Sequence, residues 1–517
     1  MKNKFLHSLS KLTALLSVFV LVGMSFTARV AAADEPYDTY NYDDRENLVY
    51  TPSAYEPIRS VAGKNLTYKG ESIGSFVTPQ DICYSDDGNL YVADTGNNRI
   101  VVLNNDMTEV VNIIDSFDNN GAKDGFKSPY GVCISENGQL YIADSQNHRI
   151  VVMEKDGTLV RIVDNPQSQS LDAGYVFVPL KVTVDYADRI YCIAQNMFEG
   201  IMVFETNGEF SGFFGTIDVK ITLWEKFWKR IATKEERSKQ QLYIPTEFTG
   251  IDVDADGFIY ATNIDSAGVQ AVRRLNPRGE DVIKKGENKN VGGDLAINGQ
   301  SQYAGASQIT DVVYRDKGIY TVLDRKRGRI FTYDHEGNLL YIFGGLGTQL
   351  GTFNTPVAIE VSGDKLVVLD AYRAELTVFN ATEYGSLINE VIALRYDGDE
   401  TLAVEKWREV LRLDENNELA NIGIGKAYLT AGDNRNAMKY LKLGMDSDYY
   451  SIAFRRYRNQ VLADNLSYIF TGIAVVIIAI VVIVRIRSRK HGWDWKGRSG
   501  GGWCAITWIA VMTSTPL

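Results

Sequence analysis

The sequence predicts a mainly β protein built from six repeated units, followed by a small α-helical region and one membrane-spanning helix. Three observations predict this arrangement. One phrase recurs 50 positions apart near the N-terminal side. The apolar periodicity changes from 2 to about 3.6 after residue 396, as at a switch from strands to helices. Residues 466–484 then form an uncharged apolar run of bilayer length.

The charge distribution excludes several function classes. The net charge of −11 divides into +4 over residues 1–33, +5 over residues 485–517 and −20 between them. So acidic a central region is a poor nucleic-acid binder, because phosphate binding needs clustered Lys and Arg. The four His and four Cys show neither CxxC nor HExxH spacing, which excludes a zinc finger, a RING and a zinc protease. We expect no cofactor.

The first 33 residues have the three parts of a secretory signal. Lys2, Lys4 and Lys11 form a positive region, an apolar stretch covers 12–24, and Ala31 begins a run of small residues suited to cleavage. We predict a signal peptide over 1–33, with an uncleaved anchor as the alternative.

The repeat is the strongest signal in the chain. Residues 76–103 read FVTPQDICYSDDGNLYVADTGNNRIVVL, and residues 126–153 read FKSPYGVCISENGQLYIADSQNHRIVVM. Weaker copies cover 177–204, 248–262, 307–333 and 353–379. Each copy holds strand-length apolar runs separated by Gly, Asp or Asn turns, which is typical of a β-propeller blade. The six copies predict a six-bladed β-propeller over 50–395, whose last blade is completed by the unattached strand 55–63.

The polar motif that ends the second strand of each copy points to a family. Its form in the first two copies, Asp94-Thr-Gly-Asn-Asn-Arg99 and Asp144-Ser-Gln-Asn-His-Arg149, resembles the NHL repeat. Copies five and six match it in part, through Asp324, Arg329 and Asp370. We expect the Asp and Arg to hydrogen-bond the turn and the neighbouring blade.

Aligning the copies places one residue of each innermost strand at an equivalent level: Asp81, Gly131, Lys181, Gly250, Asp311 and Ala358. Propellers bind ligands at such concave channel mouths, so Asp81, Tyr130, Lys181 and Asp311 are the predicted ligand-binding residues. Lactonases of the gluconolactonase type have a similar fold and hold a divalent metal there, and a metal-dependent hydrolase is therefore the alternative function. Two Asp and a Lys make a poor cage for calcium, which takes six or more oxygens.

An insertion between the third and fourth copies, residues 217–241, places Trp224, Phe227 and Trp228 on one helical face. One interpretation is a helix packed over a propeller face. The other is a docking helix for a partner or for the bilayer surface.

Residues 397–460 contain a second repeat. Ala403, Trp407 and Val410 recur 34 positions later as Ala437, Leu441 and Gly444, with Gly425 and Tyr428 between them. This pattern resembles tetratricopeptide repeats, in which helix pairs stack small residues against large ones. The resemblance implies a region that leans on the propeller or joins another subunit, with Trp407 and Tyr428 as candidate partner-docking residues.

The apolar run 466–484 predicts a transmembrane helix, and Arg485, Arg487, Arg489 and Lys490 follow it. The positive-inside rule places the tail 485–517 in the cytoplasm and residues 34–465 outside. The tail holds four of the seven Trp and is too short to span again. A shifted reading frame that truncates a longer membrane region is the favoured interpretation of this tail, and a short genuine tail is the alternative.

The complete order of segments resembles a bacterial group of membrane-anchored NHL proteins, several of which continue into a Yip1-like region. The resemblance implies a single-pass protein of the cell membrane that binds a protein or ligand on the extracytoplasmic side. A membrane transporter is a candidate partner.

Overall fold

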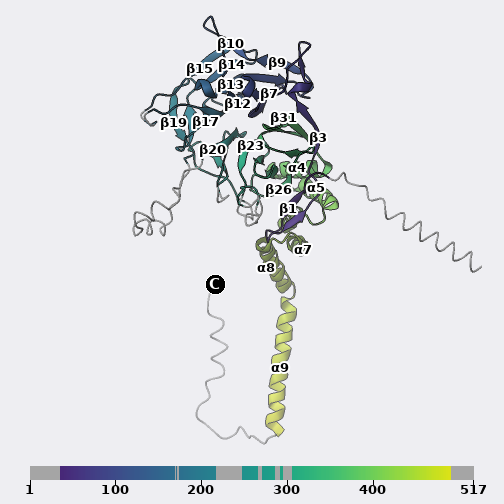
Figure 1. Ribbon diagram of the computed structural model, residues 1–517. Coiled ribbons are helices and arrows are strands. Elements are labelled where there is room, and N and C mark those ends of the chain that lie inside the picture. Colours follow the sequence, from purple (N-terminus) through teal and green to yellow (C-terminus); the bar gives the residue numbers. More distant parts are fainter. Residues whose placement is uncertain are drawn as a thin grey trace, which may run out of the picture.

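The computed structural model describes residues 35–168, 170–171, 174–216, 247–265, 270–285, 291–294 and 305–490. Six blades surround a channel, helices pack at one edge of the ring, and one long helix extends away from both (Figure 1). The predicted signal peptide, the insertion residues Trp224, Phe227 and Trp228, and the tail beyond residue 490 lie outside the described residues.

The predicted six-bladed propeller is confirmed, and each blade is an antiparallel meander that begins with its innermost strand. Blade one consists of β6 (Asp81–Tyr84), β7 (Leu90–Asp94), β8 (Arg99–Leu103) and β9 (Val110–Ile114). Blade two consists of β12 (Pro129–Ile134), β13 (Gln139–Asp144), β14 (Arg149–Glu154) and β15 (Leu159–Val163). Blade three consists of β16 (Pro179–Val184), β17 (Ile190–Ala194), β18 (Ile201–Phe204) and β19 (Phe210–Phe214).

The remaining blades follow the same plan with one variation. Blade four has three strands among the described residues, β20 (Phe248–Val253), β21 (Ile259–Asn263) and β22 (Val272–Leu275). Blade five consists of β23 (Ile309–Asp316), β24 (Ile319–Asp324), β25 (Arg329–Tyr333) and β26 (Leu339–Phe343). Blade six consists of β29 (Pro356–Ser362), β30 (Lys365–Asp370) and β31 (Glu375–Ala381), with its outer strand supplied from elsewhere in the chain.

That outer strand is β3 (Tyr55–Ala62), which confirms the predicted closure of the ring. It pairs antiparallel with β31 from Tyr55 opposite Ala381 to Ala62 opposite Glu375. The first and last parts of the propeller sequence therefore share one sheet, and the ring has no open end.

Short two-stranded hairpins lie outside the blades. The pairs are β1 (Tyr40–Tyr42) with β2 (Leu48–Tyr50), β4 (Thr67–Tyr68) with β5 (Glu71–Ser72), and β10 (Ser116–Asn119) with β11 (Ala122–Gly125). A parallel pair, β27 (Gly345–Leu346) with β28 (Thr352–Phe353), precedes blade six.

The NHL motif has a structural role. Asp94 is fully buried, and its carboxylate accepts hydrogen bonds from Val77 N at 2.8 Å, Asn97 Nδ2 at 2.8 Å and Arg99 Nε at 2.8 Å. These bonds tie the turn to the chain entering the same blade, and Asp144 repeats the arrangement in blade two. The neighbouring blade is reached instead by the turn hydroxyl, since Thr95 Oγ1 donates to Pro129 O at 2.8 Å. The predicted link to the next blade is thus made by Thr95 and by Asn98, which accepts from Ser128 N at 2.8 Å, and not by the Asp or Arg.

Blades five and six keep the motif in altered form. Asp324 pairs with Arg327 at 3.4 Å, whereas Arg329 donates to Asp38 O at 3.0 Å. Asp370 accepts from the backbone of Thr355 and Tyr372 at the corresponding turn.

Six helices follow the propeller: α4 (Glu383–Tyr396), α5 (Glu400–Leu413), α6 (Glu418–Thr430), α7 (Asn434–Leu443), α8 (Ser447–Asp464) and α9 (Leu466–Lys490). The helices α5 to α8 begin directly after Asp399, Asn417, Asp433 and Asp446, whose side chains accept from backbone N–H groups of the first turn, as N-caps do. Helix α4 lies where the sequence predicted the end of the propeller. Its β-branched residues Ile388, Val391 and Ile392 suit strands as well as helices, which explains the difference.

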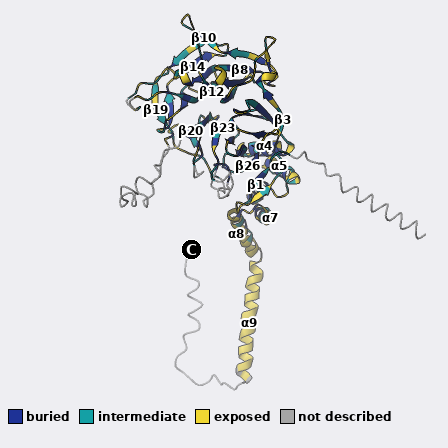
Figure 2. Cartoon of the chain, viewed as in Figure 1, coloured by how far each residue is buried: buried dark blue, intermediate teal, exposed yellow. Residues whose placement is uncertain are grey.

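The helices and the propeller share one hydrophobic core. Tyr55, Phe343 and Phe379 of blades five and six belong to the same buried cluster as Ile388 of α4 and Trp407 of α5. The helical region therefore contacts the propeller, as predicted, and it does so through one continuous hydrophobic core. Helix α9, by contrast, is exposed along its length (Figure 2).

Glycines allow the helices to pack closely against large side chains, as the small-against-large pattern predicted. A Cβ on Gly423 would meet Trp407 Nε1 at 2.3 Å, and one on Gly425 would meet Leu441 Cγ at 2.6 Å. The helix pairs exist, while their resemblance to tetratricopeptide repeats remains a prediction.

We expect Ile388→Ala to lower the free energy of unfolding of the whole propeller by about 2–5 kcal/mol, because the cavity opens in the shared core. Leu441→Ala is the matched control, since Leu441 is equally buried in a separate cluster of α6 to α8. Thermal unfolding of the full-length protein in detergent would measure both. Equal shifts of the propeller transition in the two variants would contradict a core shared through α4.

Candidate functional site: the propeller channel and its two ends

Three of the four predicted ligand-binding residues meet in the channel. Lys181 Nζ of β16 lies 2.5 Å from Asp81 Oδ1 of β6 and 3.4 Å from Asp311 Oδ1 of β23. All three side chains are buried, with exposed fractions of 4% for Asp81, 6% for Lys181 and 5% for Asp311. The innermost strands of blades one, three and five thus form an ion triad across the channel.

The acids of the channel also join neighbouring blades. The second carboxylate oxygen of Asp81 accepts from Val132 N of blade two at 3.0 Å, and that of Asp311 accepts from Ile359 N of blade six at 3.0 Å. Asp252 of blade four repeats the pattern toward Tyr314 N of blade five at 2.6 Å. Each of these three blades is therefore joined to the next by a hydrogen bond to a carboxylate on its innermost strand.

Burial and neighbouring charges shift the pKa values of the ionisable groups in the channel. Burial lowers the pKa of the Lys181 ammonium, but Asp311 and Asp81 outweigh it and hold that pKa above its usual value. Burial raises the pKa of both Asp81 and Asp311 even beside this ammonium. Burial also raises the pKa of Asp252 to about 7 and that of Glu360 well above its usual range, with the neighbouring acids adding to the effect. Protons are consequently held in the channel near neutral pH.

The sequence alignment missed Asp252 and Glu360. Each lies two residues further along its innermost strand than the aligned position. The equivalent residues of blades one, two and three are Cys83, Cys133 and Thr183. The hydrogen bond with Cys133 and burial raise the pKa of the Cys83 thiol well above its usual value, which keeps it a weak nucleophile.

Tyr130, the fourth predicted residue, is half-buried beside Lys181, and burial raises the pKa of its hydroxyl. A divalent metal does not fit this group, because the Lys181 ammonium stands between the two carboxylates and their other oxygens accept backbone N–H bonds. Within the described residues, no three His, Cys, Asp or Glu side chains are grouped as metal ligands. The triad lies across the channel, and ligand binding at its mouth stays a prediction.

The two ends of the propeller differ in surface character. We call the connector end the one where each blade passes to the next and where the second strand turns into the third. Gly96 N and Val77 O, bonded at 2.8 Å, bring these two kinds of loop together. Six large apolar side chains that are more than a third exposed lie in the loops of this end: Val77, Val176, Ile264, Leu346, Leu350 and Tyr372. In the loops of the opposite end only Tyr186 is comparable among the described residues, and the other exposed apolar residues of the ring lie on or beside its outermost strands.

The helices attach at the opposite end. Strand β31 ends there at Ala381, and α4 follows. Lys317 of the turn between β23 and β24 pairs with Asp397 at 2.9 Å, and Glu336 of the turn between β25 and β26 pairs with Arg395 at 3.4 Å. The apolar connector end is therefore directed away from these attachments.

Comparison with known families agrees with the motif. The family model of the NHL repeat matches residues 76–103 and 126–153. The chain carries NHL repeats in a six-bladed β-propeller. No curated protein matches the chain in sequence.

Three solved structures show a distant resemblance to this NHL propeller. Virginiamycin B lyase from Staphylococcus aureus matches at a TM-score of 0.40 and 12% identity, over 63% of this chain and 100% of that one. A putative gluconolactonase matches at 0.38 and 12%, over 64% and 94% of the two chains. A Bacteroides thetaiotaomicron protein of unknown function matches at 0.42 and 14%, over 63% and 76%. Likenesses at this level carry no functional argument.

The predicted docking residues of the helical region are less accessible than the sequence suggested. Trp407 is fully buried in the shared core and offers no free ring face. Tyr428 is half-buried, stacks on Tyr440 with ring centroids 5.6 Å apart and accepts a hydrogen bond from Arg408 at 3.1 Å. Their role in docking stays a prediction.

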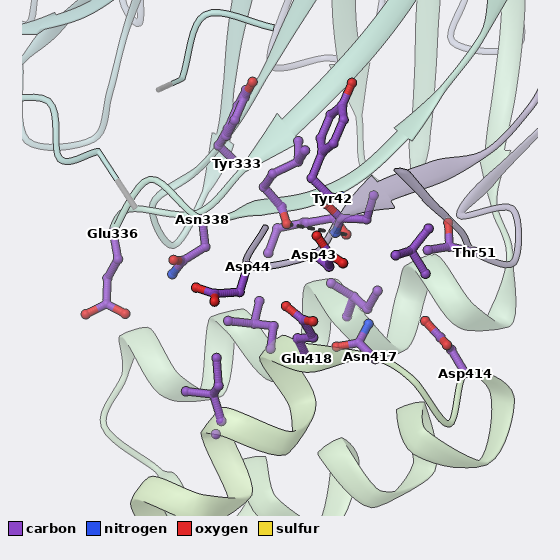
Figure 3. A pocket seen from close by; sticks show the side chains of 18 of the residues that line it. Tyr42, Asp43, Asp44, Thr51, Tyr333, Glu336, Asn338, Asp414, Asn417 and Glu418 are labelled. Carbon is purple, nitrogen blue, oxygen red and sulfur yellow. Dashed lines mark hydrogen bonds between the residues drawn. The ribbon is translucent and has the colours of Figure 1, made fainter. Parts of the chain in front are cut away.

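A pocket of about 410 Å³ lies where the NHL propeller meets the helices, and no sequence motif indicated it. Its walls come from the β1–β2 hairpin, the turn before β26, and helices α4 to α6 (Figure 3). Residues so far apart in the sequence share no repeat position, which explains why sequence analysis missed the pocket.

We expect Lys181→Met to cost about 3–5 kcal/mol of stability at pH 7, because it leaves Asp81 and Asp311 buried without a cation. The cost should shrink at pH 5, where protonated carboxylates need no partner. Lys155→Met is the control, since its bridge to Asp87 is solvent-exposed and should cost less than about 1 kcal/mol. Denaturant unfolding at the two pH values measures this, and equal costs for the two variants would contradict a structural triad.

The raised pKa of Asp252 predicts a pH dependence. A carboxyl whose folded-state pKa is raised binds extra protons when folded, so its contribution is present at low pH and is lost as pH rises toward about 7. Relative to wild type, Asp252→Asn should therefore gain about 2–4 kcal/mol of stability between pH 4 and pH 8. The same unfolding series with Asp86→Asn, an exposed acid, should show no such gain. A flat difference for Asp252→Asn would contradict burial of this charge.

Proposed function

We propose that the protein is a membrane-anchored extracytoplasmic binding protein that recruits a protein partner with the connector end of its NHL propeller. The observation that carries this proposal is that six large apolar side chains in the described connector loops are more than a third exposed, against one in the described loops of the opposite end. An end of the ring that exposes more apolar groups than the other is the better candidate for an interaction surface.

Anchoring is supported by α9. Within Leu466–Arg487, an 18-residue window has a mean hydropathy of 3.0, and no part of that window is buried against the rest of the described chain. A helix that exposes apolar side chains on every side suits lipid. The basic residues after it favour a cytoplasmic C-terminus, with the propeller outside the cell membrane.

The shared core connects the propeller with the helices that lead to this anchor. Because α4 to α6 are packed into blades five and six, and α7 and α8 pack on α6, folded structure extends from the propeller to the start of the membrane helix. A connection of this kind holds the propeller close to the membrane.

A membrane protein such as a transporter is the favoured class of partner. Helix α8 directly precedes α9 and carries exposed Ile452, Phe454, Val461 and Leu462. These apolar residues lie next to the predicted bilayer surface, where a partner embedded in the same membrane would contact them.

Site-specific photo-crosslinking in cells tests the proposal. A photoreactive phenylalanine analogue replaces Tyr372, which is 75% exposed at the connector end, or Tyr186, which is 49% exposed at the opposite end. We expect a discrete crosslinked protein from position 372 and none from position 186. Mass spectrometry would identify it. Absence of a crosslink at 372, with the protein inserted in the membrane, would contradict partner recruitment by the connector end.

A further inference from the structure

Helices α7 and α8 bring the folded part of the chain to the start of α9. Helix α8 ends at Asp464, and α9 begins two residues later at Leu466 (Figure 1). Helix α7 runs back along α8, since Asn434 in its first turn donates to Gln460 Oε1 at 3.5 Å. Gln460 lies six residues before Leu466, which is about 9 Å along a helix. The first turn of α7 and the last turns of α8 therefore lie beside the predicted bilayer surface.

The segment formed by these two helices is basic, in contrast to the chain around it. Residues 434–465 carry six Lys or Arg and three Asp, a formal charge of +3, although residues 34–484 together carry −20. Four exposed arginines lie in this segment, and we call them the arginine surface: Arg435 of α7 with Arg455, Arg456 and Arg458 of α8.

The arginine surface is not neutralised within the described chain. The salt bridges of α5 to α8 use Lys406 and Lys426 as their cations, and none of the four arginines takes part. Arg456 donates instead to the backbone oxygen of Leu429 at 3.4 Å, and Arg458 donates to the amide oxygen of Asn459 at 3.4 Å. Both acceptors are neutral, so the positive charge remains available to an anion.

The acids nearby do not balance the four arginines. Asp433 caps α7, and its carboxylate accepts the backbone and side-chain N–H groups of Asn436. Asp464 is nine residues after Arg455, which places it on the opposite side of α8. Asp448 lies at the other end of α8, away from α9. Two acids therefore lie near the membrane end of this segment, against four arginines.

The outward face of α8 combines charge with apolar surface. Helix α8 packs on α7 through buried Ala453. Arg455 and Arg458 lie on the side turned away from that contact, together with Ile452 and Leu462, which are 36% and 47% exposed. Apolar side chains that enter the edge of the bilayer beside arginines at the headgroups are typical of helices on a membrane surface.

From this placement we infer that the arginine surface binds the headgroups of acidic phospholipids in the leaflet where α9 begins. Guanidinium groups bind phosphate oxygens through paired hydrogen bonds, and every phospholipid of that leaflet presents a phosphate at the bilayer surface. The inference rests on the proposed membrane anchoring by α9 and adds a lipid as a second partner. Because the rest of the extracytoplasmic region is acidic, an acidic membrane repels it and attracts this end alone.

Native mass spectrometry of the full-length protein in detergent tests the inference. The probes are dioleoylphosphatidylglycerol, which is anionic, and dioleoylphosphatidylcholine, which has no net charge. We expect the double variant Arg455→Gln/Arg458→Gln to bind the anionic lipid at least threefold more weakly than wild type, because each basic residue near an anionic surface contributes about fivefold. Its affinity for the uncharged lipid should stay the same. Raised salt should weaken binding of the anionic lipid to wild type.

A second double variant provides the matched control. Lys123→Gln/Arg278→Gln removes two exposed positive charges from the propeller, so the two double variants have the same net charge. This control should bind the anionic lipid as wild type does, and both proteins keep the basic residues after α9. Circular dichroism would verify that each variant is folded. Equal affinities of the two double variants for the anionic lipid would overturn the inference.

Extraction of cell membranes with alkaline carbonate tests the anchoring separately. If the protein stays in the membrane while Arg455→Gln/Arg458→Gln binds the anionic lipid as tightly as wild type, the lipid inference fails and the anchoring stands. Release of the wild-type protein by carbonate would show that α9 does not span the bilayer, and both would then be overturned.

Discussion

Closure of the ring is the constraint on which the rest of the molecule depends. A four-stranded blade has two faces to bury, so the six blades hold one another only when the ring is complete. Strand β3 completes it by pairing with β31 over the length of blade six. Helix α4 then begins two residues after β31, and its buried side joins the same core as Tyr55 of the closing strand. The strand that closes the ring and the first attached helix therefore pack in the same core.

Ion pairs and hydrogen bonds in the channel also connect the blades. The triad of Asp81, Lys181 and Asp311 connects blades one, three and five across the channel, and buried carboxylates accept backbone N–H groups of neighbouring blades. Buried charges are costly unless they are paired and hydrogen-bonded, and here they are both. The proposed partner surface lies at the connector end of the propeller, away from the helix attachments.

The sequence predicted what repeats, and it missed what the fold brings together only once. Internal alignment was enough to predict six blades, the closing strand and the meeting of Asp81, Lys181 and Asp311, because equivalent positions of a propeller face one axis. The same alignment two residues further along would have shown Asp252 and Glu360. The pocket between the propeller and the helices had no such signal, since Asp44, Leu340, Trp407 and Glu418 come from segments with no common period. Helix α4 was missed because Ile388, Val391 and Ile392 suit a strand as well as a helix.

The central claim is that the propeller and helices α4 to α6 form one folded unit. Hydrogen exchange of the full-length protein in detergent, followed by mass spectrometry, tests it most directly. If the core is shared, backbone amides of β3 and β31 and those of α4 to α6 should open together and exchange at similar slow rates. Exchange of the α4 to α6 amides that is orders of magnitude faster, with β3 and β31 still protected, would show that the helices fold apart from the ring and would contradict the account.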